Sequence, residues 1–357
     1  MGNTLGYKKP KNLSDKWYPE FVATLPRMDD KIVAVTGSTT GTGFSCAMTC
    51  RQLGATVVLL NRDSDRVVAM RRSLSQLPGG TTSEGGARQS TIEGQLRAGD
   101  GEEIPDDPKI ITIPCDLSSF SSVRSAIGEL NSKFSKTGID VLVNNAGVMA
   151  LKDTATEDGF DIQMQVNHLS HFMLTQAMMP LLESAAAKRG EARIVNHSSI
   201  ARTMVTSLEA KYFEKNGGNL GGNGMTAPWT RYGQTKKANA VFTHALHDYL
   251  QKTGSKVKAM YAHPGVAATH LQVTTVESGA MPGFAASAMV SQSANDGALG
   301  IIRCACAADV KSGEFYGPTK EGYKGPADLL PPDDYSEEQK TLLWERSSEA
   351  CGVKFGD

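Results

Sequence analysis

The sequence predicts an α/β fold in which helices cover both faces of a parallel sheet. Short apolar runs that end in Gly or polar residues alternate with helical segments along most of the chain. A glycine-rich turn at 36–43, TGSTTGTG, follows the first apolar run and precedes a helical segment. The length of 357 residues and the 40% hydrophobic content suffice for one large domain with a sizeable core.

Seven strands are expected, because each is a run of apolar residues bounded by turn residues. They lie at 31–37, 56–62, 111–118, 139–147, 192–199, 256–265 and 313–318. The clearest helical segments between them end near Leu53 or span 67–77, 159–183 and 232–251. This alternation is that of a Rossmann-type doubly wound sheet of about seven parallel strands.

The chain is expected to form one domain with extensions at both ends. The parts are an N-terminal extension (1–30), a domain (31–318) with insertions at 78–108 and 200–230, and a C-terminal tail (319–357). Trp17, Phe21 and Leu25 predict a short helix docked on the core. The insertion at 78–108 is rich in Gly, Ser, Thr and acids, which predicts a flexible surface loop. A helix in the tail carries Trp344 and is a candidate for altering subunit assembly or closing a pocket.

Composition excludes several classes of function. A net charge of −1 indicates neither nucleic acid nor an anionic membrane as partner. No apolar run approaches the roughly 18–20 residues of a membrane-spanning helix, and the N-terminus lacks a signal-peptide core. Gly2 is typical of N-myristoylation, but Gly6 stands where Ser or Thr is expected, so a lipid anchor is disfavoured. The six cysteines show no paired CxxC spacing, so we expect reduced thiols, no metal and a cytoplasmic location.

The loop at 36–43 predicts a dinucleotide site, because glycines let the backbone approach a pyrophosphate and the next helix presents free N–H groups. Its expected contacts are Gly37, Ser38, Thr39, Thr40, Gly41, Thr42 and Gly43. The second strand ends at Asn61 and Arg62, which suit a ribose 2′-phosphate, since guanidinium pairs well with phosphate. NADP(H) is therefore expected, although Asp63 keeps NAD(H) as the alternative.

Tyr232 and Lys236 are four residues apart, so their side chains lie on one helix face. An ammonium beside a phenol favours phenolate, and a buried Tyr with a lowered pKa can act as a general acid or base. A Tyr and a Lys at this spacing arise easily by chance, so other motifs in the chain are needed to assign them a catalytic role.

Seven motifs together resemble the short-chain dehydrogenase/reductases over about residues 31–318. They are TGSTTGTG, CDL at 115–117, NNAG at 144–147, VNHLSHF at 166–172, IVNHSS at 194–199, YGQTK at 232–236 and HPGVAAT at 263–269. The details look most like the branch of retinol dehydrogenases and protochlorophyllide reductases. The resemblance implies hydride transfer between a nicotinamide and a carbonyl or alcohol.

The resemblance implies a role for each matching residue. Tyr232 would be the general acid/base, Lys236 its electrostatic partner and a ligand of the nicotinamide ribose, Ser199 the hydroxyl that orients the carbonyl, and Asn167 the holder of a relay water. The implied cofactor contacts, which again include Tyr232 and Lys236, are Asp116, Leu117, Asn145, Ala146, Gly147, Pro264, Gly265 and Thr269. Asp116 has an alternative role in capping a helix. Neither His168 nor His197 is required by this mechanism, so we expect both to pack or hydrogen-bond.

The resemblance implies that the segment at 270–292 covers the substrate. This segment carries Met, Phe and Ala but neither Lys nor Arg to bind a carboxylate, which indicates an apolar substrate. The alternative is that its Met residues belong to a helix core. The gap from Ser199 to Tyr232 is longer than in compact family members, so 200–230 is expected at the pocket rim. Two other functions stay open: a non-catalytic NADP(H)-binding sensor or scaffold, and light-driven reduction of a protochlorophyllide-like tetrapyrrole. A homodimer or homotetramer is expected by family analogy alone.

Overall fold

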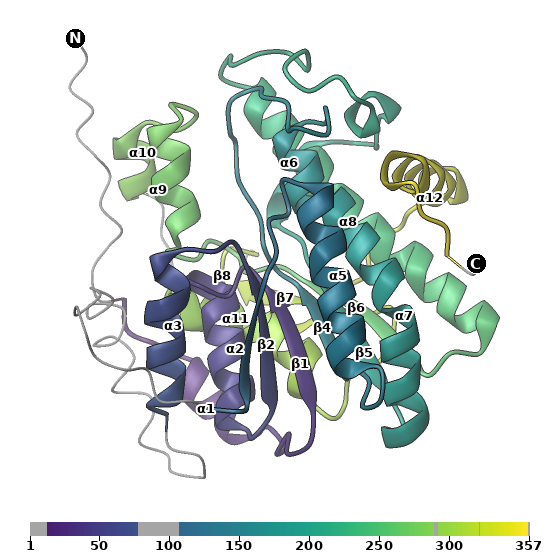
Figure 1. Ribbon diagram of the computed structural model, residues 1–357. Helices are drawn as coiled ribbons and strands as arrows, with labels where there is room; N and C mark the ends of the chain where they lie inside the picture. Colours follow the sequence, from purple (N-terminus) through teal and green to yellow (C-terminus); the bar gives the residue numbers. More distant parts are fainter. Residues whose placement is uncertain (1–12, 78–106, 289–291, 321, 356–357) are drawn as a thin grey trace.

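A single eight-stranded sheet lies between two layers of helices (Figure 1) in the computed structural model, which describes residues 13–77, 107–288, 292–320 and 322–355. The strand order is β3-β2-β1-β4-β5-β6-β7-β8. The strands are β1 (Ile32–Thr36), β2 (Thr56–Asn61), β3 (Ile110–Pro114), β4 (Val141–Asn144), β5 (Ala192–His197), β6 (Val257–Ala262), β7 (Phe315–Lys320) and β8 (Lys324–Leu330). The first seven are parallel, which confirms the predicted doubly wound α/β fold.

Helices bury both faces of the sheet. One face is covered by α2 (Gly41–Gln52), α3 (Asp65–Ser75) and α11 (Ala294–Cys306), and the other by α5 (Phe120–Phe134), α7 (Ser170–Arg189) and α8 (Ala227–Thr253). Successive side chains of a strand point to opposite faces. Val33 and Val35 therefore join the core under α2 and α11, whereas Ala34 joins the core under α5, α7 and α8.

The eighth strand corrects the expected count of about seven. β8 pairs antiparallel with β7 at the edge of the sheet, within the residues expected to form the tail. Its sequence, KGPADLL, contains a Gly and a Pro, which are disfavoured inside a sheet. An edge strand tolerates Pro, because one side of its backbone needs no ladder partner.

The N-terminal segment is docked on the core, as its apolar stripe predicts. Helix α1 (Tyr18–Ala23) begins where the Asp296 carboxylate of α11 accepts three backbone N–H groups. These come from Lys16, Trp17 and Tyr18 at 2.8, 3.0 and 2.9 Å. Trp17, Phe21 and Leu25 pack on the core under α2 and α11.

The C-terminal helix α12 (Glu337–Cys351) packs on α8 and α7. In Figure 1 it lies on the opposite side of the molecule from α9 (His270–Glu277) and α10 (Gly283–Ala288). Trp344 packs against Phe172 edge-on and against Phe242 and Phe355 at tilted angles, with ring-centroid distances of 5.8, 6.2 and 4.6 Å. The tail helix therefore completes an aromatic core beside α7 and α8.

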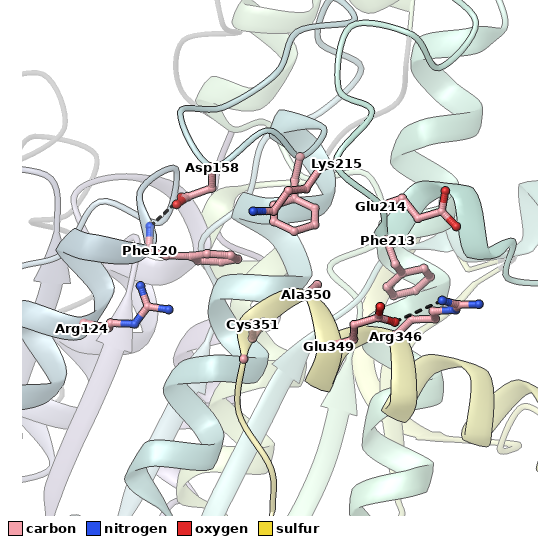
Figure 2. A pocket seen from close by; sticks show the side chains of 12 residues that line it. Phe120, Arg124, Asp158, Phe213, Glu214, Lys215, Arg346, Glu349, Ala350 and Cys351 are labelled. Atoms are coloured by element: carbon pink, nitrogen blue, oxygen red, sulfur yellow. Dashed lines mark hydrogen bonds and ion pairs between the residues drawn. The ribbon is translucent and has the colours of Figure 1, made fainter.

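The end of α12 also borders a cavity of about 590 Å³ (Figure 2). Its walls include Phe120 and Arg124 of α5, Asp158 and Phe213, with Cys351 at the end of α12. None of the site residues predicted from the sequence lies on this wall. The tail helix thus borders a cavity separate from the predicted site.

Several other expectations concern absences or undescribed segments. Most of the insertion expected at 78–108 lies outside the described residues, since the structure describes only 107 and 108 of it. Within the part of the chain that is described, no helix combines the length and apolarity needed to cross a membrane. The same residues contain no group of three or more His, Cys, Asp or Glu side chains able to hold a metal ion. All six cysteines are buried free thiols.

The carboxyl ends of the seven parallel strands meet at one edge of the sheet. The strand order reverses between β1 and β4, so the loops after these strands diverge. In open α/β sheets, ligands bind in the crevice that such a reversal creates. The predicted site residues lie at these strand ends or in the loops and helices that follow them.

Candidate active site

The glycine-rich loop joins β1 to α2 and packs tightly against the end of β4. Gly37 has φ +65, and a Cβ there would lie 2.7 Å from the Cα of Ala146. A Cβ on Gly43 would overlap the side chain of Asn145. Asn145 holds the loop, since its Nδ2 donates to the carbonyls of Thr36 and Gly37 at 2.9 and 3.1 Å. Any side chain at these glycines would therefore displace the loop.

The N-terminus of α2 opens into the same crevice. Its N-cap residue, Thr40, makes no side-chain cap, and Gly41 and Thr42 lie on the wall of the crevice. The first N–H groups of a helix have no partner within the helix and attract anions. A cradle of glycines and free N–H groups fits the pyrophosphate of a dinucleotide.

Asn61 supports the loop instead of facing the crevice with a free amide. Its Oδ1 accepts from the N–H of Ser38 at 2.7 Å, and its Nδ2 donates to Ser38 Oγ at 2.9 Å. The neighbouring cation Arg62 is exposed on the crevice wall. Arg66 of α3 lies on the same wall, and sequence reasoning missed it because it lies in a helix with no motif. Two guanidinium groups therefore stand beside the end of β2.

Asp116 forms a turn at the end of β3. Its Oδ1 accepts from the N–H and the hydroxyl of Ser118 at 2.9 and 2.7 Å. The cap of α5 is Ser119, so the alternative role of Asp116 as the helix cap is not what the structure shows. Asp116 and Leu117 both lie on the crevice wall.

Tyr232 and Lys236 lie one turn apart on α8 and face the crevice together. Tyr232 shares a hydrogen bond with Ser199, which follows the end of β5. Lys236 Nζ donates to the carbonyl of His197 at 3.0 Å and lies 5.8 Å from the centroid of the Tyr232 ring. The fold thus brings the three residues together from two elements.

Burial controls the pKa values of this pair. It raises the pKa of Tyr232 to about 12, although the hydrogen bond with Ser199 lowers that pKa. Burial also lowers the pKa of Lys236 to about 8. The expected lowering of the Tyr232 pKa by the ammonium is therefore not found, because desolvation outweighs it. Without a ligand, Tyr232 is a neutral phenol that can donate its proton.

Asn167 lies in the π-helix η2 (Gln165–Leu169), between α6 (Ile162–Met164) and α7. Its Oδ1 accepts from the N–H of Val148 at 2.7 Å. Its Nδ2 donates to the carbonyl of Val148 and to Thr235 Oγ1, each at 2.9 Å. The side chain thus ties the loop after β4 to α8, and its role in holding a water stays a prediction. Short π-helices are frequent at functional sites.

The crevice has a volume of about 780 Å³. Most of the residues predicted from the sequence lie on its wall: Gly37, Thr39, Thr40, Gly41, Thr42, Asn61, Arg62, Asp116, Leu117, Asn145, Ala146, Gly147, Tyr232, Lys236, Pro264 and Thr269. The other five, which do not line the wall, are Ser38, Gly43, Asn167, Ser199 and Gly265. Gly265 packs against the backbone of Tyr323, where a Cβ would overlap the carbonyl oxygen.

Sequence reasoning did not select all of the wall residues. The apolar ones that it missed include Leu60, Val148, Ile162, Val166 and Leu271. Thr275 and Ser278 donate to the carbonyls of Met149 and Ala150 at 3.0 and 3.1 Å, which fixes the end of α9 to the loop after β4. The sequence predicts that the segment at 270–292 is apolar, but no motif identifies the residues of the loop after β4 that it contacts.

Arg231 secures the rim of the crevice from the position before Tyr232. Its buried guanidinium donates to the carbonyls of Leu220 and Gly222 at 3.1 and 2.8 Å, and to the carbonyl of Leu151 at 3.0 Å. These acceptors belong to the expected 200–230 insertion and to the loop after β4. The insertion is therefore fastened to the helix that carries Tyr232.

Two buried carboxylates surround the same guanidinium. Asp153 lies 3.6 Å and Asp161 3.4 Å from Arg231. Asp153 accepts the N–H groups of Gly218, Leu220 and Gly222 at 2.9, 2.7 and 2.9 Å. Burial raises the pKa of Asp161 to about 6, although Arg231 lowers it. An ion network without exposure to water thus holds the insertion in one conformation.

Comparison with known proteins connects this site to a family of enzymes. A family model described as short chain dehydrogenase matches residues 93–213. Retinol dehydrogenase 14 of Mus musculus is 32% identical over 333 residues, which are 91% of this chain and 87% of that protein. An uncharacterized protein from Mycobacterium paratuberculosis, of known crystal structure, has a TM-score of 0.67 at 26% identity, over 94% of this chain and 98% of its own.

A more distant structure shows the same fold. L-sorbose reductase from Gluconobacter frateurii, solved with NADPH and L-sorbose, has a TM-score of 0.55 at 19% identity. The match covers 81% of this chain and 95% of the reductase. At this identity the likeness concerns the fold alone.

Proposed function

We propose that this chain, which belongs to the short-chain dehydrogenase/reductase family and to its retinol-dehydrogenase-like branch, reversibly transfers a hydride between NADP(H) and the carbonyl or alcohol group of a small apolar molecule. The observation that carries the proposal is the meeting of Tyr232, Ser199 and Lys236 beside the glycine-rich loop. A dinucleotide cradle and a proton donor on one wall are what such a reaction needs.

Each residue has a task in reduction of a carbonyl. NADPH, when bound, supplies the hydride that goes to the carbonyl carbon. The Tyr232 hydroxyl gives its proton to the carbonyl oxygen, and its pKa of about 12 keeps that proton in place until then. Ser199, which already hydrogen-bonds Tyr232, orients the same oxygen. The Lys236 ammonium stabilises the phenolate that results.

The return of the proton to Tyr232 is proposed to run through Lys236 and a water held near Asn167. The side chain of Asn167 is occupied by Val148 and Thr235, so its contribution would be to hold the surrounding backbone in place. In alcohol oxidation the same groups act in the opposite direction, with Tyr232 as the base.

NADP(H) is proposed over NAD(H) because two cations line the wall beside β2. Arg62 is exposed there, and Arg66 is the second residue of α3. Arg pairs with phosphate through charge-assisted hydrogen bonds. Asp63 also lies on this wall and would disfavour a 2′-phosphate, so the balance of charge still favours NADP(H) by one cation.

An apolar substrate is proposed from the apolar residues of the crevice wall. Val148, Ile162, Val166 and Leu271 line the crevice, which Tyr232 also lines. The relative named retinol dehydrogenase 14 carries a substrate of this class in its name. A retinoid, steroid, quinone-like molecule or lipid aldehyde would bury its apolar surface there.

A homodimer or homotetramer is proposed for the assembly on family analogy alone. Family members often pair through their long helices, but α12 covers part of α7 and α8 in this chain. Subunits that pair through this face would therefore contact α12 as well. Light scattering of the purified chain tests the proposal, and a monomer at micromolar concentration would contradict it.

The test of the reaction is NADPH oxidation with a panel of apolar aldehydes and ketones, repeated with NADH. Tyr232→Phe should abolish turnover while NADPH still binds. Tyr249→Phe is the matched control, since Tyr249 packs beside Trp344, away from the crevice. Tight NADPH binding without turnover on any substrate would instead favour a sensor.

A further inference from the structure

His197 is the last residue of β5, two positions before Ser199, and its buried side chain lies on the wall of the crevice. Its Nδ1 lies 2.9 Å from the Oδ1 of Asn145. Its Nε2 is buried and has no hydrogen-bond partner. Buried polar atoms are almost always paired, so an unpaired one on the wall of a crevice points to a missing ligand group.

Two buried histidines in neighbouring helices, His168 of η2 and His171 of α7, have both ring nitrogens hydrogen-bonded. His168 pairs Nδ1 with Asn239 at 3.2 Å and Nε2 with Ser347 at 2.8 Å. His171 pairs Nε2 with Thr36 at 2.8 Å and Nδ1 with the carbonyl of Asn167 at 3.0 Å. Both rings are satisfied within the protein, whereas His197 is satisfied on one side only.

The neighbours of His197 determine its tautomer. Asn145 donates through Nδ2 to the carbonyls of Thr36 and Gly37, so its Oδ1 is an acceptor, and Thr42 also donates to that Oδ1 at 3.0 Å. The Nδ1 of His197 must therefore carry a hydrogen and donate it. The pKa of His197 lies well below its ordinary value because of burial and the nearby charge of Lys236. The ring is neutral, and its Nε2 is a bare acceptor.

A bare acceptor selects its ligand. It repels the oxygens of a phosphate and accepts a hydrogen from a hydroxyl or an amide N–H. Thr42 of the phosphate-binding cradle is one residue away, because it donates to the same Asn145 Oδ1 as His197 does, so the repulsion of phosphate oxygens matters at this position. Lys236 and Tyr232, where the carbonyl is reduced, are close to His197, since Lys236 Nζ donates to its carbonyl. The hydride donor has to lie at this end.

We propose that His197 Nε2 accepts a hydrogen bond from a hydroxyl or amide N–H of the nicotinamide riboside half of the cofactor. This inference rests on the proposed function. The backbone of His197 is fixed as well, because its carbonyl accepts from Lys236 Nζ and from Asn239 Nδ2 at 3.0 and 3.1 Å. The acceptor is therefore held in place before the cofactor binds, which limits the entropy lost on binding.

The test separates the two halves of the cofactor. His197→Asn keeps an N–H near the Nδ1 position for Asn145 and removes the acceptor at the Nε2 position. One hydrogen bond between neutral groups corresponds to about a 2- to 13-fold change in affinity. NADPH should bind about that much more weakly, whereas 2′,5′-ADP, which lacks the nicotinamide riboside, should bind unchanged. His197→Gln, which restores an acceptor near the Nε2 position, should recover NADPH binding.

The matched control is His247→Asn, because His247 is only half-buried and pairs with Ser312 at 2.9 Å, away from the crevice. It should leave both affinities unchanged. Equal loss of NADPH and 2′,5′-ADP in His197→Asn would overturn the inference, because it would show a general disturbance of the loop. Unchanged NADPH binding would overturn it as well.

A second measurement uses the unmutated chain, so it does not depend on the folding of a variant. Nitrogen-15 NMR of labelled histidines should show the His197 Nε2 as unprotonated, with a resonance that moves on addition of NADPH but not of 2′,5′-ADP. A resonance that stays in place while NADPH binds would refute the inference and leave the proposed function intact. A chain that binds neither NADPH nor NADH would refute both.

Discussion

Replacement of Arg231 by Met should lower stability far more than the loss of an ordinary arginine. The variant leaves the buried carboxylates of Asp153 and Asp161 without their cation and three backbone carbonyls without a donor. Removal of one partner of a buried ion pair costs about 3–5 kcal/mol. An unfolding entropy of about 2.1 cal/mol/K per residue, over 357 residues, gives about 0.75 kcal/mol/K. The Tm should therefore fall by about 4–7 °C.

The matched control is Arg346→Met. Arg346 is also on a helix and pairs with Glu349 at 3.1 Å, but its side chain is 42% exposed. An exposed pair contributes about 0–1 kcal/mol, so the Tm should change by no more than about 1 °C. Differential scanning calorimetry at neutral pH measures both variants.

A third variant separates lost charge compensation from lost packing. Asp161→Asn in the Arg231→Met background removes one uncompensated carboxylate and should recover part of the lost stability. If Arg231→Met lowers the Tm no more than Arg346→Met does, the buried network does not hold the insertion and the reasoning is refuted.

Three further predictions concern pH, cofactor choice and the tail. The kcat/KM for NADPH should fall as the pH rises through about 8, because Lys236 loses its proton there. Tyr232, with a pKa of about 12, keeps its proton in this range. A pH–rate profile without a decline below pH 10 would contradict this prediction. Replacement of both Arg62 and Arg66 by Gln should weaken NADPH binding by about 10- to 100-fold and NADH binding by less than about 3-fold. Titration calorimetry measures both affinities. An equal loss of affinity for NADPH and NADH would refute the role of these residues in binding the 2′-phosphate. Trp344→Ala should cost about 3 kcal/mol and lower the Tm by about 4 °C with an unchanged Kd for NADPH; lost binding in a folded variant would show that the tail acts on the crevice.

The parts of the fold that the sequence predicts are those encoded locally. The parallel strands are apolar runs, and the glycine-rich loop needs glycine at Gly37 and Gly43 because no Cβ fits there. β8 escapes prediction because its Gly and Pro are tolerated only through its edge position beside β7. The π-helix at 165–169 depends on contacts of Asn167 with distant residues, so it has no local signal.

The site shows the same division. The motifs identify Tyr232, Lys236 and most of the cofactor wall, since chemistry restricts these residue types. The direction of the Tyr232 pKa follows instead from burial, which a sequence does not give. The sequence predicts Asn61 as a contact of the 2′-phosphate; Asn61 lies on the crevice wall, and its amide also supports Ser38. The sequence predicts packing or hydrogen bonding for His197, and only its unpaired Nε2 on the crevice wall distinguishes it.

The central claim is that Tyr232 delivers a proton during hydride transfer from NADPH. The most direct measurement is a single-turnover assay of NADPH oxidation with the best apolar aldehyde of the panel, comparing the unmutated chain with Tyr232→Phe at saturating cofactor. We expect a rate lower by at least about 100-fold, in line with the contribution of general acid catalysis, and an unchanged Kd for NADPH. A Tyr232→Phe variant that oxidises NADPH at the original rate would contradict the claim.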